Sequence, residues 1–433
     1  MTDPKTLTLA MLTEAVAGGA AAIRSITRLQ PAGGVGDKIF PPTYATGDKA
    51  PTRYAFEDRR IDGGIVGTVL LDSVASQANR IEDALQAAWE QERLSFPVIS
   101  VDFSKEEEIA DLDSISSLQA PHRIADALLR DSLDASDKKT RFRDTKVGQA
   151  YTAATVKNAT AVYMYCPTAL IFGVWDSTGP KGGSGSKFQR ALVSEIVGVG
   201  AEPGKKTASR LDPAGIQAVP VYHGKDDPED WTANEELAQK EKKSGKPVPF
   251  SRKGAEGKGK ASAVNHSNIA PTIEEKAGGV TISYAQQTIV LSLPALRRLR
   301  FVTDGADQAL SGPARLQAEN AARVSLAALA LAGVAEQRRH GYDLRSRSLL
   351  VPESGQPLSF EVVPADGGPG TSYVLSVDAA AKLLADASAL AAKAGFVWER
   401  APIRLVPAPK LSDLIRESRK RSAEGEAEEG AGS

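Results

Sequence analysis

Cysteine, histidine and long apolar runs are scarce in this chain of 433 residues. The single cysteine, Cys166, excludes a disulfide within the chain and a cysteine-rich zinc site. The histidines lie far apart and lack the HExxH spacing of zinc proteases: His122, His223, His266 and His340. No apolar run reaches the roughly 18 residues that a membrane-spanning helix needs. We therefore expect no metal, no cofactor and no membrane partner.

Net charge is also small, because 53 Lys and Arg stand against 54 Asp and Glu, for a formal charge of -1. A protein that coats nucleic acid by bulk charge would be basic, although local basic grooves remain compatible with this balance. The acidic tail over residues 423–430 has no apolar periodicity and predicts disorder. The start Met1–Lys5 lacks the charged-then-apolar layout of a signal peptide, so we expect a cytoplasmic protein.

Strand and helix patterns follow one another irregularly. Alternating or β-rich segments predict strands over 20–29, 96–101, 280–285 and 288–293, and near Ser348 and Phe360. Helical spacing predicts helices over 5–17, 70–85, 120–129, 308–335 (which Gly312 and Pro313 can split), 378–394 and 411–419. Residues 159–174 are apolar and β-rich and are divided by Pro167, which predicts two buried strands or one broken strand. Without regular βαβ alternation, this mixture favours an α+β fold with insertions.

Composition divides the chain into four parts. Residues 1–200 and 273–410 carry the ordered patterns, and 411–433 form a short helix with the acidic tail. Between them, residues 201–272 are polar and rich in lysine and glycine, which predicts a peripheral, partly mobile insertion.

One helical face stands out. If residues 70–85 are helical, each residue turns the chain by about 100° around the helix axis. Four polar side chains then fall in one narrow sector beside a separate apolar stripe: Ser73, Ser76, Gln77 and Arg80. Hydroxyl, amide and guanidinium donors near a helix start suit a phosphate, because the first N–H groups there are unpaired. A solvated helix face explains the same pattern, since every amphipathic helix has one.

Cations gather in further segments that are candidates for nucleic-acid contact. They are the 38–60 loop with Arg53, Arg59 and Arg60, the 138–146 patch with Lys138, Lys139, Arg141 and Arg143, the glycine-rich 175–190 loop with Lys181, Lys187, Phe188 and Arg190, and the 297–300 turn. Aromatic faces stack on bases while cations meet phosphates, and glycine lets backbone amides approach an anion. For the 38–60 loop, a solvated long loop is an equally good interpretation.

Catalytic patterns are weaker than binding patterns. The 182–187 loop matches neither the P-loop nor GxGxxG, and Ser184 is not in a GxSxG elbow. His122 is a candidate general base, but a histidine at a helix start more often caps or packs. Asp58 and Asp62 would suit a metal-dependent endoribonuclease, the alternative function, although loop aspartates usually form turns.

Three segments carry a resemblance to a known family. They are VLLDSVASQANRIEDAL (69–85), APHRIADALLRDS (120–132) and PTALIFGVWDSTGPKGGSGSKFQRALVSEIVG (167–198). The chain resembles the CRISPR-associated backbone subunit of the type I-G (formerly I-U) interference complex, a member of the RAMP superfamily. The similarity runs from about residue 23 to 198 and continues more diffusely to about 405.

The resemblance implies an RRM-like (ferredoxin-like) palm with finger and thumb insertions. It implies copies that stack into a helical filament along one CRISPR RNA, grip its backbone and leave stretches open to pair with a target DNA strand. Other partners implied are the large subunit, the guide-processing subunit and a recruited helicase-nuclease, so the chain itself would not be an enzyme.

The resemblance also assigns roles to residues. Related families carry a Ser-Ser-Gln-x-x-Lys-Arg-like helix start that contacts guide phosphates, which corresponds here to Ser76, Gln77 and Arg80. Asn79 stands where a lysine is common, which leaves a neutral donor. The 175–190 segment would be the thumb hairpin or glycine-rich loop, with Phe188 as the wedge between bases.

Overall fold

The computed structural model describes residues 5–47, 50–177, 179, 185–217, 219–251, 258–399 and 401–431. The chain divides into two compact units. Unit 1 comprises residues 1–48, 53–203 and 279–411, and unit 2 comprises residues 49–52, 204–278 and 412–433. Each unit has its own sheets and its own buried side chains.

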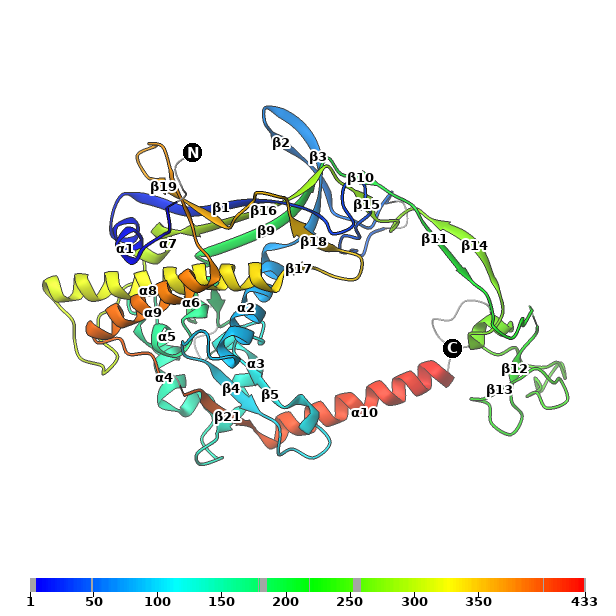
Figure 1. The fold of residues 1–433 in the computed structure, drawn as a ribbon. Helices are drawn as coiled ribbons and strands as arrows, with labels where there is room; N and C mark the ends of the chain where they lie inside the picture. Colours follow the sequence, from blue (N-terminus) through cyan, green and yellow to red (C-terminus); the bar gives the residue numbers. More distant parts are fainter. Residues whose placement is uncertain are drawn as a thin grey trace. The chain divides into compact units, whose positions relative to one another are not determined.

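Unit 1 is built on a large antiparallel sheet (Figure 1). Its strands are β1 (Ala20–Pro31), β2 (Phe56–Ile61), β3 (Gly64–Asp72), β9 (Leu192–Val199), β16 (Tyr284–Ser292), β17 (Tyr342–Asp343), β18 (Leu349–Pro352), β19 (Ser359–Pro364) and β20 (Thr371–Val374). The order is β17-β18-β1-β16-β9-β3-β2, and β19 pairs with both β1 and β20. The long central pairs place Ile26 opposite Thr288 and Thr288 opposite Glu195.

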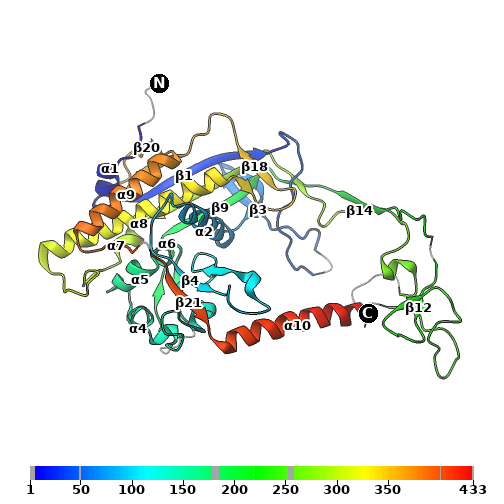
Figure 2. The ribbon, with the colours of Figure 1, turned by 60° about the horizontal axis from the view of Figure 1, so that its bottom comes forward.

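Helices cover one face of this sheet (Figures 1 and 2). They are α1 (Leu9–Ala17), α2 (Val74–Glu90), α7 (Leu293–Arg297), α8 (Gly312–His340) and α9 (Val377–Lys393). Burial alternates along β1, where Ile23, Ser25, Thr27 and Leu29 face the helices. Helix α8 is enclosed over most of its length, since every residue from Ala321 to Gln337 is buried.

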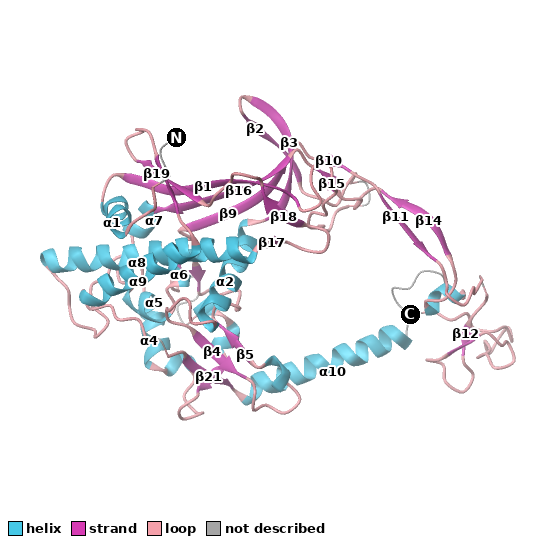
Figure 3. Cartoon of the chain, in the orientation of Figure 1, coloured by secondary structure: helices cyan, strands magenta, loops and turns pink. Residues whose placement is uncertain are grey.

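A second, smaller sheet lies in unit 1. Its strands are β4 (Ile99–Asp102), β5 (Ser114–Ser116), β6 (Ser132–Asp134) and β21 (Ile403–Pro407), in the order β5-β4-β21-β6. Only β4 and β21 run parallel within it. η1 (Ala110–Leu112) joins β4 to β5, and η2 (Arg123–Ala125) and α3 (Ala127–Arg130) join β5 to β6. η3 (Phe142–Asp144) and α4 (Lys146–Ala153) follow β6, and Figure 3 shows α4 close to this sheet.

Unit 2 contains two short ladders and a small apolar core. β11 (Lys206–Arg210) pairs with β14 (Ile269–Glu274), and β12 (Tyr222–His223) pairs with β13 (Trp231–Thr232). The core joins Val221, Phe250, Ala261 and Ala263, the last two from η5 (Ala261–Val264). Helix α10 (Pro409–Ala431) covers both the predicted 411–419 helix and the acidic segment for which the sequence predicted disorder.

The prediction of an α+β fold is confirmed, and the architecture is compatible with an RRM-like palm. The predicted strands over 159–174 are wrong, because this segment forms α5 (Thr160–Tyr165) and α6 (Thr168–Phe172). All five residues of α6 are buried, so no polar face marks a helical period in the sequence. Pro167 precedes α6 with a ψ of -27°, in the right-handed α region, and so starts a helix instead of dividing a strand.

The predicted continuous helix over 120–129 is also wrong. The chain forms the 3-10 turn η2 and then α3, which begins anew after Asp126. Asp126 has an extended ψ of 144°, and its carboxylate accepts a hydrogen bond from the Leu128 N–H. The aspartate is therefore an N-cap between two short helices.

Candidate nucleic-acid interface

Helix α2 begins where strand β3 ends. Ser73 is its N-cap, and the Ser73 hydroxyl accepts a hydrogen bond from the Ser76 N–H at 3.3 Å. Ser73 and Ser76 are half-buried, and Asn79 is exposed on the next turn. The start of α2 therefore presents short polar side chains beside a helix N-terminus, an arrangement that suits an anion.

Gln77 points away from this surface and into the core. Its side chain is fully buried, and its Nε2 donates to the buried Asp72 carboxylate at 2.6 Å. Its Oε1 accepts from Ser194, Gln287 and Gln337 at 2.8, 2.9 and 3.2 Å. The predicted polar sector is thus divided, because Gln77 ties α2 to the sheet and to α8.

Arg80 lies at the edge of the same network. Its Nε donates to Asp72 Oδ2 at 2.9 Å, and its other nitrogens donate to the carbonyls of Asp343 and Leu344. Arg345 also reaches Asp72, at 3.4 Å. Two cations therefore surround one buried carboxylate, and the Arg80 side chain remains 28% exposed.

The cations of the 38–60 loop are spread around the hairpin of β2 and β3. Arg53 precedes β2 and is exposed, and Arg60 is exposed on the strand itself. Arg59 is paired with Glu57 and with Glu195, the latter at 2.8 Å. Only Arg53 and Arg60 therefore present guanidinium groups that are not part of this carboxylate cluster.

The 138–146 patch follows β6 and ends at the first residue of α4. Lys138, Lys139 and Arg141 are exposed. Arg143 instead turns inward and pairs with the buried Asp176 at 3.0 Å. This ion pair joins the 138–146 patch to the 175–190 segment, which the sequence could not show.

The 175–190 segment contains a short hairpin of β7 (Val174–Trp175) and β8 (Lys187–Phe188). Successive side chains on a strand point to opposite faces, so the paired Val174 and Phe188 face inward while Trp175 and Lys187 face outward. The Phe188 ring is 3% exposed, whereas Trp175 is 52% exposed with the Lys187 ammonium 5.0 Å from its ring centroid. The aromatic ring that this hairpin presents is therefore Trp175 rather than the predicted Phe188. Lys181 lies outside the described residues.

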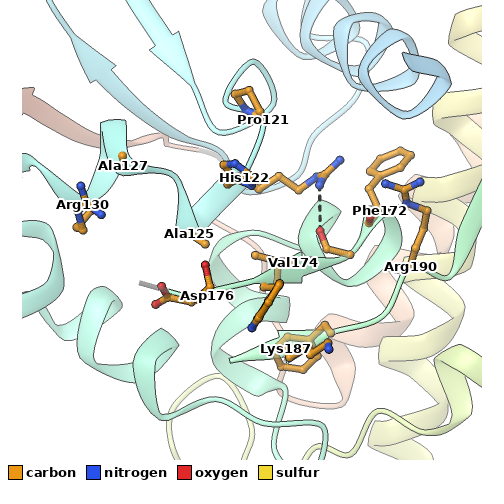
Figure 4. Close-up of a pocket in the computed structure, with 15 residues that line it drawn as sticks. Pro121, His122, Ala125, Ala127, Arg130, Phe172, Val174, Asp176, Lys187 and Arg190 are labelled. Carbon is orange, nitrogen blue, oxygen red and sulfur yellow. Dashed lines mark hydrogen bonds between the residues drawn. The ribbon is translucent and has the colours of Figure 1, made fainter. Parts of the chain in front are cut away.

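A cleft of about 730 Å³ opens beside the hairpin (Figure 4). Its lining combines aromatic rings with cations: Pro121, His122, Arg123, Ala125, Ala127, Arg130, Phe172, Gly173, Val174, Trp175, Asp176, Ser177, Lys187, Phe188 and Arg190. Arg190 donates from Nε to the Phe172 carbonyl at 3.0 Å, and burial lowers the pKa of its guanidinium. Lys187 and Arg190, predicted from the sequence, thus line one cavity together.

Arg123 and Glu82 form a buried ion pair at the wall of this cleft. Arg123 donates from Nε and Nη2 to the two Glu82 oxygens at 2.6 and 2.5 Å, and from Nη1 to the Gly173 carbonyl at 2.9 Å. Burial raises the pKa of the Glu82 carboxyl to about 7, although the charge of Arg123 opposes this rise by stabilising the carboxylate. Sequence reasoning missed this pair, because 41 residues separate its members and nothing local links them.

Comparison with protein families connects this geometry to a biological setting. Residues 23–203 match the family model described as CRISPR-associated protein GSU0053. The match shows a CRISPR-associated protein. It supports a role in CRISPR defence and interaction with other CRISPR components, and it spans α2, the 138–146 patch and the hairpin of β7 and β8. No curated protein matches the chain.

Two further properties concern the described part of this CRISPR-associated protein. Within it, no three His, Cys, Asp or Glu side chains gather as a set of metal ligands, and no helix is both long and apolar enough to cross a membrane. Asp58, on β2, and Asp62, in the turn that follows with a φ of 49°, are both exposed.

Proposed function

We propose that this chain is a non-catalytic, CRISPR RNA-binding backbone subunit of a type I-G, DNA-targeting interference complex in the cytoplasm. The observation that carries the proposal is the cleft beside the hairpin of β7 and β8, where Trp175, Lys187 and Arg190 meet. An exposed indole suits a stacked base, and adjacent cations suit the phosphates on either side of it. The CRISPR-associated family supplies the setting in which such an RNA is a guide.

In this proposal the protein recognises the phosphates and shape of the guide RNA, and the guide recognises the target sequence by base pairing. Ser73, Ser76 and Asn79 at the start of α2 bind guide phosphates, and Trp175 interrupts the base stack. Copies of the chain assemble along one guide RNA, together with the large subunit and the guide-processing subunit. The target DNA strand pairs with the exposed guide, and a recruited helicase-nuclease cuts it.

Binding of a single-stranded guide RNA over a range of salt concentrations tests the proposal. If lysine and arginine side chains neutralise about three phosphates, the affinity should fall roughly 20-fold between 50 and 200 mM monovalent salt, because each neutralised phosphate releases bound counterions. An RNA affinity that does not change with salt concentration would instead support an assembly scaffold whose RNA contacts are incidental.

The alternative, a RAMP-type metal-dependent endoribonuclease, is tested in the same preparation. Cleavage of guide or target RNA with Mg²⁺, lost in Asp58→Ala or Asp62→Ala, would overturn the non-catalytic proposal. We expect the RNA to remain intact with wild-type protein and with both variants.

A further inference from the structure

Two arginines hold consecutive carbonyls where the chain enters the hairpin of β7 and β8. Arg190 donates to the Phe172 carbonyl at 3.0 Å, and Arg123 donates to the Gly173 carbonyl at 2.9 Å. Gly173 has a φ of 86°, and a Cβ there would lie 3.0 Å from the backbone nitrogen of Arg190 and 3.2 Å from the backbone carbonyl oxygen of Phe188. The turn before Trp175 therefore needs glycine and is held by two guanidinium groups from outside.

Arg123 is itself held tightly. Both ends of its fork bond the Glu82 carboxylate, and the two side chains are 7% and 2% exposed. Its guanidinium also lies 5.4 Å from the centroid of the Phe172 ring. Arg123 has a φ of 53°, in the left-handed region that is uncommon for residues other than glycine. The buried ion pair and the uncommon backbone conformation of Arg123 together orient its guanidinium toward the Gly173 carbonyl.

Glu82 belongs to α2, the helix whose first turn carries Ser73 and Ser76. Nine residues separate Ser73 from Glu82, or about 13 Å along a rigid helix. The Glu82–Arg123–Gly173 chain of contacts therefore connects the start of α2 mechanically to the hairpin that presents Trp175.

We infer that Glu82 and Arg123 are positioning residues for RNA: they fix the Gly173 turn, and thereby the orientation in which Trp175 and Lys187 face the cleft. This inference rests on the proposed function and adds a role for a buried ion pair, in which Arg123 forms part of the cleft wall and Glu82 lies behind it. It predicts that the pair matters for RNA affinity even when the fold is intact.

The test removes the pair without leaving a buried charge. In Glu82→Leu/Arg123→Met, apolar side chains of similar size replace the ion pair, a change that folded proteins commonly tolerate. The matched control is Arg93→Met/Glu336→Leu. It removes another ion pair with a buried carboxylate, in which Arg93 Nη2 lies 3.0 Å from Glu336 Oε2. Neither Arg93 nor Glu336 lines this cleft. The measurements are affinity for a single-stranded RNA and quenching of Trp175 fluorescence, identified with a Trp175→Phe variant.

We expect the Glu82→Leu/Arg123→Met variant to bind RNA about tenfold more weakly, the loss that follows when one base stacks poorly. RNA should quench its Trp175 fluorescence less, and in the RNA-free protein acrylamide should quench Trp175 differently from wild type. The control should match wild type in all three measurements. If the Glu82→Leu/Arg123→Met variant folds and matches wild type in all three, the inference is overturned.

A milder variant covers the case in which the double variant fails to fold. Arg123→Lys keeps a cation for Glu82 but loses the planar fork that reaches both Glu82 and Gly173. The same losses in Arg123→Lys support the inference, and unchanged RNA affinity overturns it. Wild-type protein that binds no RNA would instead overturn the proposed function, and the acrylamide measurement would then show whether the pair still positions Trp175.

Discussion

Two aromatic residues in the hairpin of β7 and β8 have opposite environments. Trp175→Ala should weaken RNA binding about tenfold while leaving the unfolding free energy nearly unchanged, because its ring is half exposed. Phe188→Ala should instead lower the unfolding free energy by about 3 kcal/mol, since its ring is buried. RNA titration and urea unfolding of both variants measure these effects. The reverse outcome would show that Phe188 is the wedge.

Arg80 serves a buried carboxylate, so its truncation has a structural effect. Arg80→Ala should lower the unfolding free energy by about 2 kcal/mol, because Asp72 loses its closest cation. Asn79→Ala, on the same turn but exposed, is the control and should leave stability unchanged. Urea unfolding compares the two. Equal stabilities would mean that Arg345 and Gln77 suffice for Asp72.

Among the elements, α8 carries a buried carboxylate that three arginines surround. Glu319 is fully buried and is paired with Arg300, Arg315 and Arg323 at 2.8 to 3.0 Å. Burial alone would raise the pKa of Glu319, but the hydrogen bond from Arg300 and the charge of Arg323 outweigh it and hold the pKa below its usual value near 4.5. Arg300 follows α7, so this cluster fastens the connection between α7 and α8 to α8 itself.

Glu319→Gln should lower the unfolding free energy by about 3 kcal/mol at pH 7, since it leaves three arginines without their carboxylate. A depressed pKa stabilises the fold above about pH 4.5, and this contribution disappears as pH falls through the folded-state pKa. The difference between wild type and Glu319→Gln should therefore shrink on acidification, as measured by urea unfolding at pH 7 and pH 4. A difference that stays constant with pH would contradict this account.

Elements that are half exposed were predictable from the sequence. The alternation over residues 20–29 and the helical spacing over 378–394 correspond to β1 and α9, because each has one buried and one polar face. The segment over 159–174 was not predictable, because no residue of α5 or α6 is exposed and the sequence therefore lacks the polar face that distinguishes a helix from a strand. Local sequence therefore identifies an element best where solvent marks one of its faces.

At the scale of the whole molecule, the polar segment 204–278 leaves unit 1 at a pair of adjacent strands. β10 (Glu202–Pro203) pairs with β15 (Val280–Thr281), so Pro203 lies opposite Val280. Gly279 has a φ of 81°, as the second residue of a two-residue type I′ turn requires. Replacing residues 204–278 by one asparagine would create an Asn-Gly turn between these strands.

This shortened protein should unfold cooperatively with an unfolding free energy equal to or above that of wild type, because the loop that must close is much shorter. Thermal unfolding followed by circular dichroism measures this, with the full chain as reference. Loss of the cooperative transition would mean that unit 1 needs the 204–278 segment to fold.

The sequence by itself determined the α+β class, the segments in which cations gather and the approximate position of α2, because periodicity and composition are local properties. The predicted helix over 70–85 began too early, since residues 70–72 end strand β3 and α2 spans Val74–Glu90. The resemblance to a CRISPR-associated family also rested on sequence alone, and residues 23–203 bear out that broad assignment. Only the tertiary structure decided which polar and aromatic residues face outward. It placed Gln77 and Phe188 inside, Trp175 outside, and Glu82 against Arg123. Such partners lie far apart in the chain, and their contacts depend on how the elements pack.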